Sequence, residues 1–361
     1  RPTGSISLGA GYSTSDGVIL SAGFAQDNVF GSGKSVSVEV NTSQSMRTYA
    51  LNLGEPYITP EGISRNWTVY DRRVDLDELD VSNVAYETLG AGINFGLPVT
   101  ELDRVFLGAR FETTKVDLRG TLEQAMAGND DAASPLRYYN YVSEYGKTSQ
   151  AALLTLGWSR DSRDNALAPT RGRYQRLSAE FALPALDQRY YRATYQFTQY
   201  IPLSRAWTLG LNMQVGYGDT YGSKMYPFFK NFYAGGIGSV RGFENSTLGP
   251  RDGRNGDNLG GDRQFVFSAE LLTPLPGADR TLRGLVFLDG GYVWGYEPVF
   301  GSAGYKYERQ NLDFNDLRYS VGFGIAWISP LGPLKFSLAF PLNEKPGDNT
   351  QRFQFQIGTG F

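Results

Sequence analysis

The residues best placed to do chemistry in this chain surround Arg241, which stands between glycines and aromatic residues in a long polar stretch. Residues 231–243 read Asn-Phe-Tyr-Ala-Gly-Gly-Ile-Gly-Ser-Val-Arg-Gly-Phe. A guanidinium held away from bulk water needs carboxylate partners, because an unpaired buried charge is costly. The chemistry on offer is therefore charge-assisted hydrogen bonding.

Two carboxylates lie on segments in which apolar and polar residues alternate. Glu270 shares the polar face of residues 265–271, and Asp289 lies opposite the apolar face of residues 286–292. Side chains alternate between the two faces of a strand, so both carboxylates would point to the same inner side of a sheet. We expect Arg241 to bridge them. The alternative is that all three are ordinary charges lining a lumen.

Composition excludes several other classes of function. The 361 residues include no Cys and no His, which leaves no disulfide, thiolate nucleophile, imidazole base or usual zinc or haem site. We therefore expect no enzyme, no metal and no other cofactor. A net charge of −3 without a basic cluster also argues against nucleic acid as a partner.

Apolar residues recur with the period of a strand along the whole chain. Phe353, Phe355 and Ile357 fall on one face near the carboxy terminus, while Gln354 and Gln356 fall on the other. No apolar run approaches the roughly 18 residues that a membrane helix needs. Alternation in a chain of mean hydropathy −0.34 instead suits a membrane barrel, with one face toward lipid and one toward water.

Turn signals set the number of strands. Seven short Pro- and Gly-rich turns alternate with eight connections, of which 116–147, 219–263 and 295–314 are long. This predicts an all-β fold, a 16-stranded antiparallel transmembrane β-barrel with short periplasmic turns and long external loops. We expect one domain over residues 1–361, with a first strand near 5–12 and a last strand near 351–361.

Further segments accompany Val240-Arg241-Gly242-Phe243. These are residues 231–236, Leu248-Gly249-Pro250, residues 329–334 and residues 354–358. Together they resemble the BamA family, the central subunits of the barrel-assembly machinery in Gram-negative outer membranes, over essentially the whole chain. The resemblance implies that loop 219–263 folds into the lumen and that Glu270 and Asp289 are the acidic partners of Arg241. One departure is a short, cysteine-free loop between Pro250 and Gly261, which leaves receptor roles of the loop surface open.

The place where the first and last strands meet is the second candidate site. Its residues are Ile6, Leu8, Gly9, Gly11 and Tyr12 on the first strand and Ile357, Gly358, Gly360 and Phe361 on the last. Glycine weakens strand interiors, and an opened seam would expose an edge that can pair with an incoming strand. The alternative is that these glycines only permit close packing and curvature.

The resemblance implies an insertase that folds and inserts outer-membrane β-barrel proteins through this lateral gate, without covalent chemistry. Its partners would be nascent barrel proteins, outer-membrane lipid and lipopolysaccharide, and barrel-assembly lipoproteins. Because the chain begins at Arg1 with no signal peptide, we expect a mature fragment without the amino-terminal periplasmic domains on which those lipoproteins dock. The alternatives are a two-partner secretion or autotransporter-assembly translocase of the same superfamily, and a passive porin.

Overall fold

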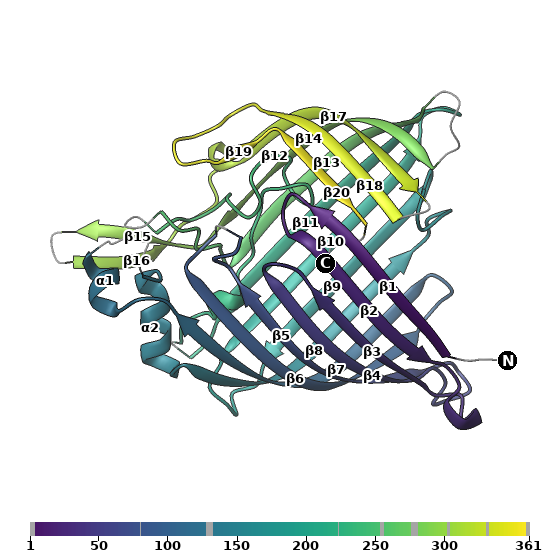
Figure 1. Cartoon of the computed structure of the whole chain (residues 1–361), viewed down its shortest axis with the longest axis horizontal. Helices are drawn as coiled ribbons and strands as arrows, with labels where there is room; N and C mark the ends of the chain where they lie inside the picture. The colour runs from purple at the N-terminus through teal and green to yellow at the C-terminus, as the bar shows by residue number, and fades with distance from the viewer. Residues whose placement is uncertain are drawn as a thin grey trace.

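The chain folds mainly into antiparallel strands that close on themselves (Figure 1). The computed structural model describes residues 4–79, 81–127, 133–222, 224–252, 256–275, 281–301, 304–329 and 332–358. Within these residues sixteen strands form one closed barrel, in which each strand pairs with the next barrel strand along the chain. The predicted sixteen-stranded antiparallel barrel is confirmed.

The barrel strands have the following bounds. They are β1 (Gly4–Ser13), β2 (Gly17–Gln26), β3 (Ser35–Thr42), β4 (Met46–Glu55), β5 (Ser64–Asp75), β6 (Val84–Pro98), β7 (Asp103–Leu118), β8 (Thr148–Asp161), β9 (Gly172–Ala182), β10 (Tyr190–Pro202), β11 (Thr208–Thr220), β13 (Arg263–Pro274), β14 (Leu282–Trp294), β17 (Arg318–Ser329), β18 (Gly332–Pro341) and β20 (Phe353–Ile357).

The remaining elements lie in the connections. They are the paired strands β12 (Gly242–Phe243) and β19 (Thr350–Gln351), the hairpin β15 (Tyr296–Gly301) and β16 (Gly304–Arg309), the helices α1 (Leu122–Ala127) and α2 (Leu136–Tyr145), and the 3-10 turns η1 (Val29–Gly31), η2 (Phe228–Lys230) and η3 (Phe314–Asp316). No helix among the described residues is long and apolar enough to cross a membrane.

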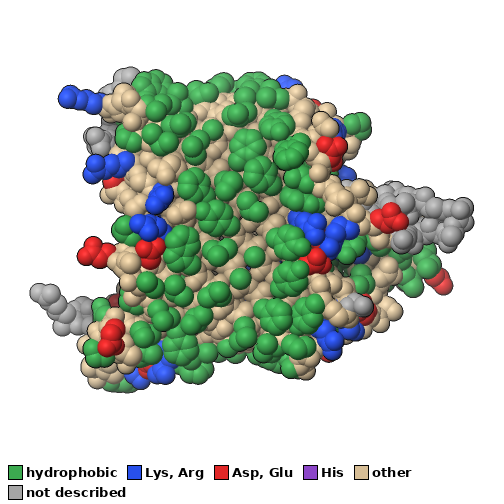
Figure 2. All heavy atoms as spheres, turned by 180° about the vertical axis from the view of Figure 1, so that it is seen from behind, with side chains coloured by type: hydrophobic (Ala, Val, Ile, Leu, Met, Phe, Trp, Pro, Cys, Tyr) green, Lys and Arg blue, Asp and Glu red, His purple; other side chains and the backbone are tan. Residues whose placement is uncertain are grey.

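The outer face of the barrel is apolar. Val321, Phe323, Ile325 and Trp327 are exposed at alternate positions of β17, and Figure 2 shows hydrophobic side chains in a broad band across one side of the molecule. Charged side chains gather toward the two edges of this band. An apolar surface of this extent is unfavourable in water but matches the hydrocarbon of a bilayer. The alternation therefore places aromatic and aliphatic residues toward lipid, as predicted.

The long connections contain structure that period-two alternation did not predict. The expected loop 116–147 holds α1 and α2, and the expected loop 295–314 holds the β15–β16 hairpin. Figure 1 shows these elements at one end of the barrel, with the amino terminus at the other. Short helices of this kind depend on tertiary packing rather than on their own propensity. Their place at the external end therefore reflects the contacts they make there.

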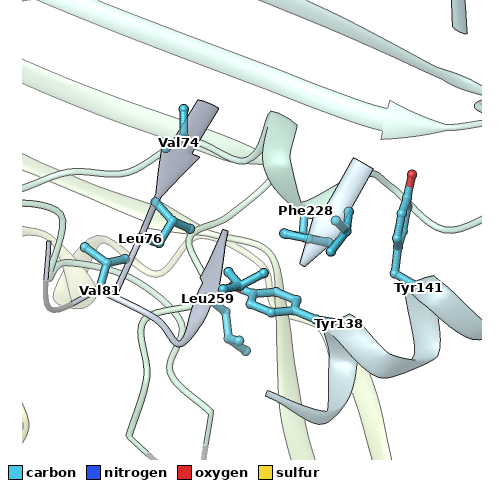
Figure 3. Packing of buried hydrophobic residues seen from close by; sticks show 9 residues of the cluster. Val74, Leu76, Val81, Tyr138, Tyr141, Phe228 and Leu259 are labelled. Atoms are coloured by element: carbon cyan, nitrogen blue, oxygen red, sulfur yellow. The ribbon is translucent and has the colours of Figure 1, made fainter. Parts of the chain in front are cut away.

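A hydrophobic cluster joins the external loops (Figure 3). Tyr138 of α2 stacks on Phe228 of η2 with ring centroids 4.1 Å apart, and Tyr141 meets the same ring edge-on at 5.4 Å. Leu76 and Val81, from the β5–β6 connection, and Leu259 are buried in the same cluster. Three external connections thus share one core, which holds loop 219–263 where it begins and where it ends.

Candidate functional site

Arg241 lies against two neighbouring strands of the barrel wall, β13 and β14. Its Nε and Nη2 donate to the two carboxylate oxygens of Asp289 on β14, at 2.6 and 2.8 Å. Nη2 is also 2.8 Å from an oxygen of Glu270 on β13 and donates to the Ser268 hydroxyl at 3.1 Å. The structure therefore brings together the three charged residues that the sequence singled out. The planar guanidinium of Arg241 binds both oxygens of the Asp289 carboxylate, and the Glu270 carboxylate lies beside it.

The register of β13 and β14 explains how one arginine reaches both strands. Ser268 is the Cα partner of Asp289, and its hydroxyl donates to that carboxylate at 2.6 Å. The Asp289 side chain is fully buried and that of Arg241 is 8% exposed. Burial opposes the charge of the guanidinium, but the hydrogen bond and charge of Asp289, aided by Glu270, outweigh it and raise the pKa of Arg241. The site is thus a buried Arg241–Asp289 ion pair with the partly exposed Glu270 carboxylate beside it.

The neighbours of Arg241 fix the loop by packing and by backbone shape. Val240 and Phe243 are fully buried in a cluster with side chains of β13 and β14. Gly242 has φ +91°, and a Cβ there would lie 3.1 Å from the Cβ of Ala339 on β18. Only glycine adopts this backbone conformation without strain, which accounts for its place after the arginine.

A second cation holds the same loop at another part of the wall. Lys230 Nζ lies 2.9 Å from a Glu112 oxygen on β7 and 3.3 Å from a Glu180 oxygen on β9. The strands β10 and β11 separate this point from the strands that hold Arg241. Lys230 was not predicted from the sequence, because no motif marks it. The only sequence signal for this site was that alternation places Glu112 and Glu180 on the inward faces of two separate strands.

Further polar side chains complete the Lys230 site. Arg110 lies 3.0 Å from Glu112 and 2.6 Å from Glu180. The Tyr70 hydroxyl donates to Glu112 at 2.6 Å. A similar bond from the Tyr190 hydroxyl to Glu180 is 2.5 Å long. Two carboxylates, two cations and two phenols thus neutralise and hydrogen-bond one another, as a buried charged cluster requires.

Among the residues that the structure describes, the junction of β1 and β20 is the shortest pairing in the barrel wall. Its ladder joins only Tyr12 to Ile357 and Ser13 to Gln356, and the Thr14 N–H donates to the Phe355 carbonyl at 3.1 Å. By contrast β1 pairs with β2 from Gly4 to Ser13. Residues 4–11 of β1 therefore have no ladder partner on their other edge among the described residues.

The described part of the last strand ends beside a glycine. The strand expected at 351–361 is observed over Phe353–Ile357, and Gly358, which follows it, has φ +82° and donates its N–H to the Pro333 carbonyl of β18 at 2.8 Å. A Cβ on Gly11 would come within 2.6 Å of the Ile357 carbonyl oxygen. Gly360 and Phe361, which we placed in the seam, lie outside the described residues.

The large apolar seam residues of β1 are exposed. The exposed fractions are 77% for Ile6, 82% for Leu8 and 41% for Tyr12. Tyr12 stacks on Phe355 with centroids 5.3 Å apart, so the contact across the seam is aromatic as well as hydrogen-bonded. Gly9 faces Ser21 of β2, where a Cβ would lie 2.4 Å from the hydroxyl oxygen. Gly9 thus relieves crowding toward β2, whereas Gly11 permits the approach of β20.

Comparison with known proteins gives consistent matches. The model of the Omp85 superfamily domain matches residues 28–361. The chain is 41% identical to the outer membrane protein assembly factor BamA of Neisseria meningitidis serogroup B, over 100% of this chain and 47% of that relative. It is 22% identical to the mouse sorting and assembly machinery component 50 homolog, over 100% of this chain and 73% of that relative. The chain spans about half the length of the BamA relatives it matches.

Solved structures show the same architecture. The crystal structure of BamA from Haemophilus ducreyi lacking POTRA domains 1–3 superposes with a TM-score of 0.82 at 27% identity, covering 99% of this chain and 70% of that one. CdiB from Acinetobacter baumannii gives a TM-score of 0.58 at 14% identity, covering 98% of this chain and 58% of that one. The second likeness concerns the fold alone.

Proposed function

This chain belongs to the Omp85 superfamily, and from that premise we propose that it folds and inserts β-barrel proteins into the outer membrane through the seam between β1 and β20. It is an outer-membrane barrel of the BamA type, as the sequence predicted. The observation that carries the proposal is the edge of β1, most of which has no ladder partner among the described residues, beside a described junction of two residue pairs. No covalent step is required of it.

The physical basis is the cost of an unpaired strand edge in lipid. Backbone N–H and C=O groups without partners in the hydrocarbon region cost several kcal/mol each. Residues 4–11 of β1 have no ladder partner on this edge among the described residues, so in this proposal they present such groups next to the bilayer. An incoming strand would satisfy these groups by β-augmentation, so the edge favours templated pairing. Breaking a two-residue junction costs far less than opening any other strand pair.

The Arg241 cluster supports this function by holding the loop that occupies the lumen. Arg241, Glu270 and Asp289 act as a latch, with Val240 and Phe243 packed beneath it. In this proposal residues 1–361 form one domain, preceded in the whole protein by periplasmic domains that dock accessory lipoproteins. Nascent barrel proteins are the substrates, and outer-membrane lipid and lipopolysaccharide form the surroundings in which they insert.

A disulfide across the seam tests the proposal. Tyr12 and Ile357 are Cα partners, so Tyr12→Cys with Ile357→Cys places two thiols at bridging distance in a chain that has no other cysteine. The pair is introduced into the full-length protein, and assembly of other outer-membrane barrels is measured with and without reductant. We expect the oxidised pair to stop assembly and reduction to restore it.

A matched control places the disulfide across a long strand pairing. Ala91 and Phe111 are Cα partners in the long β6–β7 ladder, and their disulfide should leave assembly unchanged. If a verified Tyr12–Ile357 bridge also leaves assembly intact, the seam is not the working part. A secretion translocase or a porin of the same fold would then be the better account, and export of a secreted partner or steady conductance would separate those two.

A further inference from the structure

The side chain of Gln354 joins the last barrel strand to the loop that carries Arg241. Its Nε2 donates to the Phe243 carbonyl at 2.7 Å, and its Oε1 accepts from the Gly242 N–H at 3.4 Å. The Gln354 side chain is fully buried. One amide thus provides both an acceptor and a donor to two consecutive loop residues, as a neighbouring strand would.

The segment before β20 holds the same two loop residues through its main chain. Gly242 pairs with Gln351 and Phe243 with Thr350 in the β12–β19 ladder, and the Glu244 N–H donates to the Asn349 carbonyl at 2.9 Å. Figure 1 shows β12, β19 and β20 on the same side of the barrel. Residues 349–354 therefore clasp the loop directly beside the Arg241 cluster.

This clasp rests on a fixed support. Asp348, which directly precedes residues 349–354, accepts from Arg318 Nε at 2.5 Å and from its Nη2 at 3.1 Å. The two side chains are 6% and 7% exposed, and Arg318 is the first residue of β17. A buried bidentate pair of this kind fixes orientation as well as distance. The segment is thus tied to the wall at one end and to the loop at the other.

A continuous series of contacts runs from the latch to the seam. Asp289 holds Arg241, the next loop residue is Gly242, and Gln354 holds Gly242 from β20. β20 pairs with β18 over residues 353–357 but with β1 only at its end. Gln354 therefore adds a contact from the lumen side to the ladder with β18 that positions β20.

We propose that Gln354 is a positioning residue that couples the seating of loop 219–263 to the opening of the β1–β20 seam. The inference rests on the proposed function, since seam opening matters only if the seam admits a strand. With the loop seated, Gln354 holds β20 against the lumen side and the two-residue junction stays formed. When the latch releases the loop, β20 loses this support and the junction opens more often.

Amide hydrogen exchange of segment 8–14 measures the opening. The Thr14 N–H in this segment donates to the Phe355 carbonyl across the seam. The full-length protein in lipid nanodiscs is compared as parent, Arg241→Glu, Gln354→Leu and the double variant, with no client protein present. We expect each single substitution to speed exchange about 5-fold or more, the lower end of common coupling strengths. The double variant should exchange no faster than the faster single variant.

Two further variants keep the test decisive. Gln356→Leu alters a glutamine two residues along the same face of β20, and Arg241→Glu should still speed exchange in that background. Gln354→Asn keeps a buried amide that is too short to reach the loop, so it should behave as Gln354→Leu does and replaces it if the leucine variant does not fold.

The coupling would be overturned if the exchange rate were unchanged in Gln354→Leu and Gln354→Asn. It would also be overturned if the rate increases of Arg241→Glu and Gln354→Leu multiplied in the double variant. Because no client is present, this experiment can fail while the seam disulfide still blocks assembly. If instead the exchange results are as expected but the oxidised seam disulfide leaves assembly intact, the coupling through Gln354 stands and the insertase proposal is refuted.

Discussion

Arg241 and Lys230 hold the same loop to two parts of the barrel wall, each between two carboxylates, but they do so with different geometry. Arg241 places a planar fork on both oxygens of Asp289, and its guanidinium carbon lies 3.5 Å from the centre of the Phe287 ring. Lys230 offers one ammonium to Glu112 and Glu180. A fork fixes direction, whereas an ammonium is a point charge with rotatable donors.

The two sites also differ in what remains when the cation is lost. Without Arg241, the buried Asp289 keeps only the hydroxyl of Ser268 and the loop N–H as described partners. Without Lys230, both glutamates still face Arg110 and each keeps a tyrosine hydroxyl. We infer that the contacts of Arg241 specify the position of the loop. The contacts of Lys230 mainly neutralise the two glutamates where the loop meets the wall.

Reversing the charge of Arg241 should have the largest effect. Arg241→Glu removes one partner of a buried ion pair, at a cost of about 3–5 kcal/mol, and adds repulsion with two carboxylates. We expect the loop to become accessible to protease and the barrel to unfold at a lower temperature on semi-native gels. Arg205→Glu, at an exposed periplasmic turn, is the control. Unchanged protease resistance in Arg241→Glu would contradict the latch.

Removing the second cation should have a smaller effect. Lys230→Met keeps most of the apolar length of the side chain but leaves Glu112 and Glu180 with Arg110 as their remaining cation. Loss of charge-assisted hydrogen bonds of this kind costs about 1.5–3 kcal/mol. We expect faster amide exchange near residues 224–231 with the Arg241 contacts retained. A loss equal to that of Arg241→Glu would show that the two ends are equivalent, contrary to the comparison.

The smallest change tests whether the Lys230 site is a network. Tyr70→Phe removes one hydrogen bond to Glu112 and leaves both cations in place. The expected cost is about 1 kcal/mol, seen as a small fall in the unfolding temperature. In a Lys230→Met background the same change should cost more, because Glu112 then depends more on the phenol. Strictly additive losses would mean that the members act independently.

Local patterns predicted the wall of the barrel better than its interior. Alternation identified Glu270 and Asp289 as inward-facing, since the side-chain period of a strand needs no knowledge of distant residues. The same rule placed Gln354 on the inner face but gave no partner for it. Its partners are backbone groups 111 and 112 residues earlier in the chain. Lys230 was missed for the same reason, because its two glutamates lie on strands far from it in sequence.

Residue order was sufficient for the strand number, the lipid-facing side and the Arg241 motif, because turns and period-two alternation are properties of a few consecutive residues. The contact that closes the barrel was settled by packing, since the described ladder joins β20 to β1 at two residue pairs and Gly358 bonds a carbonyl of β18. The clasp of Gln354 on the loop is likewise a product of the closed barrel. Closure brings the last strand, the first strand and a mid-chain loop together, and no local signal records which of their atoms will meet.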